Sequence, residues 1–138
     1  MGRSVLGRWI VIGGAVAAFA LSVTAGGLAQ EKWTAPEDAK KLKNPVAKSA
    51  KVLAEVKKIF ETNCVACHGP KGLGDGPAGA SLPVKPANWT VPAVQKETDG
   101  ELFWKISNGR GPMPAWKGII SENDRWALIH FIRTFAKK

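Results

Sequence analysis

Apolar side chains recur at three- and four-residue spacing in three separate stretches of this 138-residue chain. Over residues 49–63 they alternate with lysines and glutamates, which predicts an amphipathic helix with Ser49 as its N-cap. Residues 98–108 predict a second helix, because Thr98-Asp99-Gly100-Glu101 fits a capping box. A third helix is predicted to begin at Ser121 and to run towards the C-terminus. No stretch alternates convincingly as a strand, so the expected fold class is all-α.

The segments between these helices are rich in glycine and proline. Residues 69–92 carry so many of both that no regular element is predicted there. Residues 109–120 are also expected to be irregular. A loop of this length is unusual in a small domain. It becomes reasonable if the loop packs on a large cofactor instead of on other parts of the chain.

The first residues have the pattern of an export signal. Arg3 and Arg8 precede an apolar run over residues 10–25, and small residues before Gln30 resemble a cleavage site. We expect a signal peptide over 1–29, a polar, lysine-rich spacer or loosely docked arm over 30–48, and one domain over 49–138. Retention as a membrane anchor is the alternative, although the run is short of the roughly 20 residues that span a bilayer. The expected location is the periplasm, or the outer face of a bacterial inner membrane if the segment is retained.

The charge balance narrows the class of partner. The formal net charge is +9, and removal of the signal segment leaves the chain strongly basic. Such a surface can steer encounter with redox proteins that have acidic docking surfaces, or with an anionic membrane. No nucleic-acid-binding motif is visible, and nucleic acid is not an expected partner outside the cytoplasm.

The candidate chemistry lies in Cys64-Val65-Ala66-Cys67-His68, a C-x-x-C-H motif typical of c-type haem attachment. The two thiols add across the two vinyl groups of one porphyrin, and the adjacent histidine then becomes the proximal iron ligand. Cys64 and Cys67 are the only cysteines of the chain. We therefore expect one covalent haem c.

A C-x-x-C pair has two other common uses in proteins. A thioredoxin-like dithiol would need a βαβ context and no following histidine. A zinc site would need four ligands, and only Cys64, Cys67, His68 and the distant His130 are available. Adjacent Cys67 and His68 would not easily close on one tetrahedral ion.

The sixth position of a histidine-ligated iron is expected to be filled by Met113. It is flanked by Pro112 and Pro114 in a loop, where a methionine has little value as a filler of apolar space. His130, beside the apolar stripe of the last helix, is the rival. A thioether ligand favours ferrous iron, and six-coordinate iron has no open site for substrate. The expected chemistry is electron transfer and not catalysis.

With these motifs in order, residues 52–135 resemble a class I cytochrome c of the bacterial, single-haem type. The resemblance is carried by the C-x-x-C-H helix, the glycine-rich stretch over 72–79, Gly111-Pro112-Met113-Pro114-Ala115-Trp116 and the last helix. It implies a cytochrome c fold, with three or more helices wrapped around one covalent haem.

The resemblance also implies several contacts. The first and last helices should cross near Phe60 and Phe131. A proline carbonyl, from Pro77 or Pro83, should accept a hydrogen bond from His68. The haem propionates should be met by three further cofactor-binding residues: Asn88, Trp89 and Arg110.

The expected function is single-electron transfer between respiratory or dehydrogenase partners. The alternative is a dedicated cytochrome c subunit of an exported oxidoreductase complex. A gas sensor or peroxidase is the third reading. It would need an open or switchable iron, and a typical dihaem peroxidase would need a second C-x-x-C-H motif, which the chain lacks.

Overall fold

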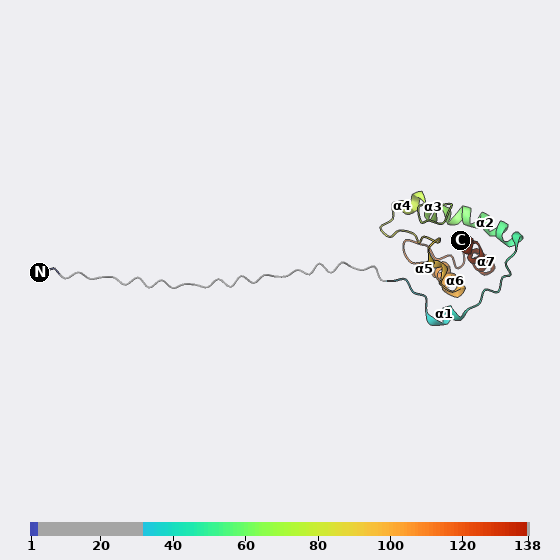
Figure 1. Ribbon diagram of the computed structural model, residues 1–138, viewed down its shortest axis with the longest axis horizontal. Coiled ribbons are helices and arrows are strands. Elements are labelled where there is room, and N and C mark those ends of the chain that lie inside the picture. Colours follow the sequence, from blue (N-terminus) through green and yellow to red (C-terminus); the bar gives the residue numbers. More distant parts are fainter. Residues whose placement is uncertain (3–31, 138) are drawn as a thin grey trace. The chain divides into compact units, whose positions relative to one another are not determined.

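The computed structural model describes residues 1–2 and 32–137, and the predicted signal segment over 1–29 lies almost wholly outside them. In the described part the chain forms short helices joined by irregular loops (Figure 1). The elements are α1 (Glu37–Lys41), α2 (Ala50–Asn63), α3 (Val65–His68), α4 (Pro77–Ala80), α5 (Pro92–Gln95), α6 (Asp99–Asn108) and α7 (Glu122–Arg133). Its only β features are isolated bridges, so the all-α expectation is confirmed for these residues.

The three predicted helices begin where their caps stand. The Ser49 side chain accepts a hydrogen bond from the Val52 N–H at the start of α2. Thr98 and Glu101 form both halves of the capping box at the start of α6. Ser121 caps α7. These caps satisfy backbone N–H groups that have no partner within the helix, and each is worth about 1 kcal/mol.

The core forms where α2 and α7 pack together, with α6 against α7. Phe60 of α2 meets Phe131 of α7 with ring centroids 5.1 Å apart, as the family resemblance implied. Ile129 is wholly buried at this crossing. Phe103 of α6 stacks on Trp126 of α7, with centroids 3.9 Å apart. The burial of these side chains holds the three longer helices together, because each buried aliphatic or aromatic group contributes about 1.5–3 kcal/mol.

The glycine- and proline-rich segment contains more structure than the sequence predicted. One turn of helix, α4, begins at Pro77, and α5 begins at Pro92. Proline is tolerated at the first helical position because its missing N–H would have no intrahelical partner there. The prediction of no regular element was therefore wrong for residues 77–80.

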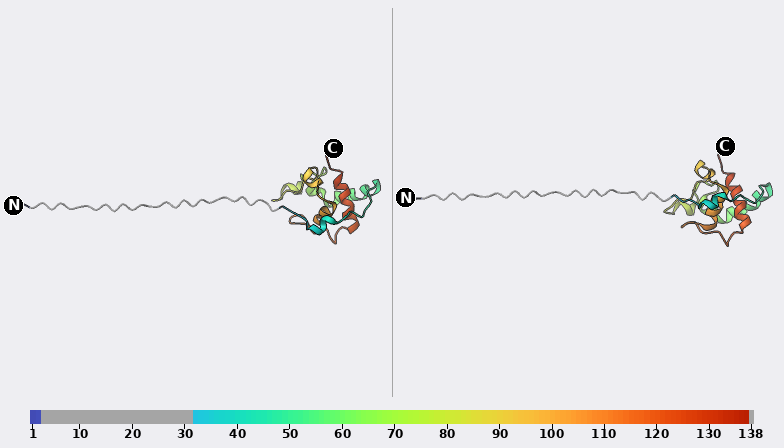
Figure 2. Two further views of the ribbon diagram at one scale, coloured as in Figure 1. Left: turned by 60° about the horizontal axis from the view of Figure 1, so that its bottom comes forward. Right: turned by 90° about the horizontal axis from the view of Figure 1, so that it is seen from below.

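The segment over 30–48 is a docked arm in its described part. Its helix α1 packs against α6 (Figure 2). Ala35 and Ala39 are buried. A side chain at Gly100 would collide with the Ala39 carbonyl oxygen, so this glycine permits the close approach of the arm. The Asn44 side chain donates a hydrogen bond to the Trp126 carbonyl at 3.0 Å. Of the two expectations for this segment, the docked arm is the one that fits.

Within residues 1–2 and 32–137, no helix has both the length and the apolar character needed to cross a membrane.

Candidate functional site

The C-x-x-C-H segment forms a tight turn between two helices. Cys64 ends α2 and immediately precedes α3. Its carbonyl accepts hydrogen bonds from the Cys67 N–H at 3.2 Å and the His68 N–H at 2.9 Å. Both cysteine side chains are half-buried and form no disulfide. The turn therefore presents two thiols and an imidazole within five consecutive residues.

Burial raises the pKa of the Cys64 thiol to about 12, and the nearby Cys67 adds to the shift. Cys64 therefore stays a thiol at neutral pH. Reactive dithiols of the thioredoxin type instead depend on a lowered thiol pKa. No group of three or more metal-binding side chains occurs among residues 32–137, so the zinc alternative has no support there. Neither the raised thiol pKa nor the surrounding side chains therefore favour redox exchange or zinc binding at this turn.

His68 is 8% exposed, and its ring is held from two sides. Nδ1 lies 3.2 Å from the Ala87 carbonyl oxygen, and the Trp89 ring stacks on the imidazole at 4.1 Å. Because a carbonyl only accepts, Nδ1 carries the hydrogen and Nε2 keeps its lone pair. Burial lowers the pKa of His68, and the bond to Ala87 acts in the opposite direction. The imidazole is thus presented as a neutral ligand.

The acceptor is therefore not the one the family resemblance implied. Neither Pro77 nor Pro83 supplies the carbonyl for His68. It comes from Ala87, the residue after Pro86. The chain returns to His68 at this point because the Trp89 N–H donates to the Gly72 carbonyl at 2.7 Å, which ties the end of the loop to its beginning.

The glycine-rich loop packs directly on the C-x-x-C-H turn. A side chain at Gly76 would collide with the Ala66 carbonyl, and one at Gly79 would collide with the Cys67 carbonyl. Only glycine allows the two backbones to approach so closely. This packing holds the thiols and the imidazole on a fixed backbone. Two free thiols and a histidine with an available Nε2 are the donor set that a c-type haem needs.

Met113 lies in a short, closed turn before Trp116. Its backbone exchanges two hydrogen bonds with Arg110, of 3.1 and 2.9 Å. Its side chain is half-buried against the same core cluster that Cys64 borders. Both predicted haem-contacting segments therefore lie on one continuous core.

The remaining predicted site residues have identifiable neighbours. The Asn88 Oδ1 atom accepts from the N–H and the hydroxyl of Thr90, at 2.9 and 2.8 Å. Trp89 is buried beside His68 and is part of the core. The Arg110 guanidinium lies over the Trp33 ring, 5.2 Å from its centroid. Trp89 thus lies against His68, and Asn88 stands between it and Ala87 in the sequence. The backbone of Arg110 is hydrogen-bonded to the backbone of Met113.

The rival ligand His130 is engaged elsewhere. Its Nε2 lies 2.6 Å from the Val46 carbonyl oxygen, which fixes the hydrogen on that nitrogen and turns the side chain towards the arm. Its half-buried position agrees with the reading of His130 as a structural residue.

Two contributors to the site were not foreseen. The Ala87 carbonyl could not be recognised from residue type, because it is a backbone group, although the proline before it marks a turn. Trp33 of the arm lies over both Lys105, at 5.6 Å, and Arg110. An aromatic residue in an otherwise polar segment was the signal that could have indicated a docked arm.

Comparison with known proteins gives one family and two groups of relatives. Residues 51–132 match the family described as cytochrome C oxidase, cbb3-type, subunit III. The chain is 32% identical to cytochrome c6 of Cladophora glomerata over 60% of its own length and 88% of that protein. It is 34% identical to the cbb3-type cytochrome c oxidase subunit FixP of Bradyrhizobium diazoefficiens, over 59% of this chain but only 27% of that subunit.

A solved structure supports the fold. A chain of the Kuenenia stuttgartiensis reducing HAO-like protein complex Kustc0457/Kustc0458 superposes with a TM-score of 0.61. The match covers 70% of this chain and 50% of that one, at 24% sequence identity. At this identity the likeness concerns the fold alone.

Proposed function

This chain belongs to the single-haem, class I cytochrome c family, and from that membership we propose that it transfers single electrons through one haem c held by Cys64, Cys67 and His68. The observation that carries the proposal is the turn over residues 64–68. It offers two thiols that form no disulfide, and a histidine whose Nδ1 is already hydrogen-bonded to the Ala87 carbonyl. Bound haem supplies an iron that exchanges one electron between its ferrous and ferric states.

The residues of the chain have separate tasks in this proposal. Cys64 and Cys67 form thioether bonds that prevent loss of the cofactor. His68 offers Nε2 to the iron, and Ala87 fixes the tautomer and orientation of the ring, as partners of metal-bound histidines commonly do. Trp89 covers the buried imidazole and excludes water from it.

Met113 is proposed as the second axial ligand. Its support is its place in a short turn closed by Arg110, and its half-burial against the core that Cys64 also borders. His130 is a weaker candidate, because its Nε2 already bonds to Val46. A soft thioether raises the reduction potential and leaves no open position for substrate, which suits electron transfer. Asn88 and Arg110 are proposed to meet the propionates.

The proposed partners are redox proteins with acidic docking surfaces. The proposed location is the periplasm or the outer face of the inner membrane, with the signal segment over 1–29 either removed or retained as an anchor. The strong positive charge of the chain supports this choice of partner, since opposite charge speeds encounter.

A dedicated subunit of an oxidoreductase complex is the second candidate. It is favoured by the match to the cbb3-type subunit III family and by the likeness to subunit FixP. The chain spans only about a quarter of FixP, so a place in an oxidase complex is a proposal for this chain. Purification at moderate salt separates the two candidates: a mobile carrier leaves its partners, whereas a dedicated subunit stays bound to them.

The attachment site can be tested by mass and spectrum. The intact exported protein should carry the mass of one haem, and its alkaline pyridine spectrum should be that of a haem with two thioether bonds. Cys64→Ser and Cys67→Ser should each shift that spectrum towards a haem with one thioether bond. Val65→Ala, in the same turn, is the control and should leave the spectrum unchanged. Full attachment in both serine variants would contradict the proposal.

A further inference from the structure

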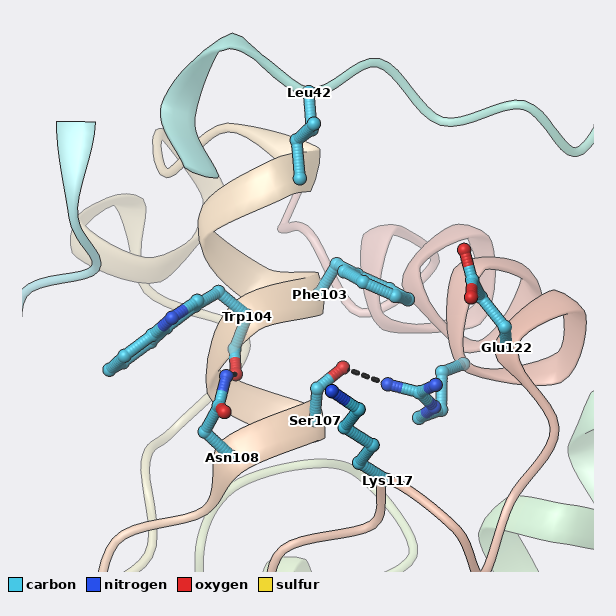
Figure 3. Close-up of a pocket in the computed structure, with 8 residues that line it drawn as sticks. Leu42, Phe103, Trp104, Ser107, Asn108, Lys117 and Glu122 are labelled. Atoms are coloured by element: carbon cyan, nitrogen blue, oxygen red, sulfur yellow. Dashed lines mark hydrogen bonds between the residues drawn. The ribbon is translucent and has the colours of Figure 1, made fainter. Parts of the chain in front are cut away.

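A groove of about 290 Å³ lies between the second half of α6 and the start of α7, apart from the C-x-x-C-H turn. Phe103 and Ser107 of α6 line one side of it, and Glu122 and Arg125 of α7 line the other. Lys117, from the loop before α7, also lines the groove (Figure 3). Its size suits a small ligand or a single side chain.

Arg125 is the unusual member of this groove, because it is only 5% exposed. Its Nε–H donates to the Ile120 carbonyl at 3.2 Å, and Nη1 donates to the Ser107 hydroxyl. The guanidinium carbon lies 4.9 Å from the centre of the Phe103 ring. All of these partners are uncharged. No carboxylate pairs with Arg125 among residues 32–137.

The half-buried Arg133 of the same helix shows the usual arrangement. Arg133 donates to the Asp99 carboxylate from Nε at 3.2 Å and from Nη2 at 2.7 Å. Buried charges are normally paired in this way, because removing an ion from water is costly. Arg125 is therefore a largely buried cation that lacks the carboxylate partner that Arg133 has.

The other charges of the groove do not supply that anion. Figure 3 shows the Lys117 side chain pointing towards Ser107, which is hydrogen-bonded to Arg125, so two cations face the same space. Glu122 lines the groove, but its carboxylate is turned away and forms no ion pair with Lys117 or Arg125. Two cations and one carboxylate leave the groove with a local excess of one positive charge.

From this juxtaposition we infer that the groove binds a carboxylate group, with Arg125 and Lys117 as its cationic partners. A guanidinium edge matches the two oxygens of a carboxylate. A singly charged group balances the local excess, whereas a doubly charged phosphate would be opposed by Glu122. The Phe103 ring forms an apolar wall for the carbon attached to the carboxylate. That group is either a free small acid or an acidic side chain of a docked protein.

The site is independent of haem ligation, and its test can be read without electron transfer. The full, haem-loaded protein is kept reduced and is titrated with sodium acetate, with the ionic strength held constant by sodium chloride. The Ser107 amide and the Arg125 Nε–H are followed by nuclear magnetic resonance. Both signals should shift and saturate. A second titration uses acetylglutamate amide, which presents a protein-like carboxylate. Tighter binding of this probe assigns the groove to a protein side chain, and tighter binding of acetate assigns it to a free acid.

Three variants test which charged side chains affect binding of the carboxylate. Lys117→Gln should weaken binding about two- to fivefold, the range expected for one exposed charge. Glu122→Gln removes the competing carboxylate and should strengthen binding by a similar factor. Lys51→Gln, an equal charge change on the exposed face of α2, should have no effect. The inference is overturned if chloride alone gives the same shifts, if the shifts do not saturate with either probe, or if the Lys117 and Lys51 variants behave alike.

Discussion

The Nδ1 atom of His68 lies 3.2 Å from the Ala87 carbonyl oxygen, across the loop of residues 69–86. This one bond joins the C-x-x-C-H turn to the end of the glycine-rich segment. It makes Nδ1 the donor and directs the free lone pair of Nε2 away from Ala87. The loop that contains few regular elements therefore orients the one histidine on which the proposed electron transfer depends.

The sixth ligand is tested by substitution of Met113. If its thioether binds the iron, the oxidised protein has a weak far-red charge-transfer band, which Met113→Ala should abolish. The same variant should have a lower reduction potential and should bind carbon monoxide in the ferrous form, because loss of the soft ligand opens the site. The assignment fails if the band survives in Met113→Ala and disappears in the control variant His130→Ala.

The docked arm should contribute measurably to stability through Trp33. Its ring lies against Lys105 and Arg110, and each exposed contact of this kind is worth about 0.5–1 kcal/mol. Trp33→Ala should therefore lower the free energy of unfolding by about 1–2 kcal/mol in urea titrations of the haem-loaded protein. Trp33→Phe keeps an aromatic face and should lose less. An alanine variant as stable as the parent would mean that the arm is not held by this ring.

The capping box of α6 predicts a dependence of stability on pH. Partial burial alone would raise the pKa of the Glu101 carboxyl, but hydrogen bonding with Thr98 and attraction to Lys40 and Lys105 outweigh it and lower the pKa below 4.5. The stability that this carboxylate contributes is therefore present above the unfolded value and is lost as pH falls through the lower folded value.

Glu101→Gln removes the titrating group and keeps a side chain that can accept from the Thr98 N–H. Between about pH 6 and about pH 3, the parent should lose more unfolding free energy than this variant, by at most about 1 kcal/mol at a half-exposed site that solvent screens. Glu55→Gln on the exposed face of α2 is the matched control and should follow the parent. Equal acid losses in the parent and the Glu101 variant would contradict the role of the box.

How much the sequence could predict depended on the kind of signal. Ser49, Thr98 and Ser121 mark helix starts because their side chains bond to nearby backbone, a local effect. The contact of Phe60 with Phe131 followed from the family resemblance. The acceptor for His68 could not be derived, since it is a backbone carbonyl, and any residue at 87 would provide one.

The arm was harder to read for a related reason. Ala35 and Ala39 are small, and they lie among lysines and prolines, so they give little apolar periodicity. Their burial depends on Gly100, far along the chain, which leaves room for the Ala39 carbonyl. The single turn of α4 was missed because proline was treated only as a helix breaker, although it is favoured at a first helical position.

Encounter with an anionic electron acceptor should depend on lysines near the C-x-x-C-H turn. Ferricyanide is a suitable probe, and its rate of oxidising the reduced protein should fall as salt shortens the Debye length from about 10 Å at 0.1 M to about 3 Å at 1 M. Lys71→Glu with Lys85→Glu should slow the reaction more than Lys41→Glu with Lys43→Glu in the arm. Equal effects of the two pairs would mean that overall charge, and not a local surface, controls encounter.

The central claim is that one haem c, attached at Cys64 and Cys67, exchanges single electrons. An optical redox titration of the intact protein tests it most directly. The absorption spectrum of a c-type haem should change reversibly between its reduced and oxidised forms in one transition, with a slope of about 59 mV for each tenfold change in their ratio. A protein with no reversible haem transition, or one with the slope of about 30 mV that a two-electron dithiol couple gives, would contradict the account.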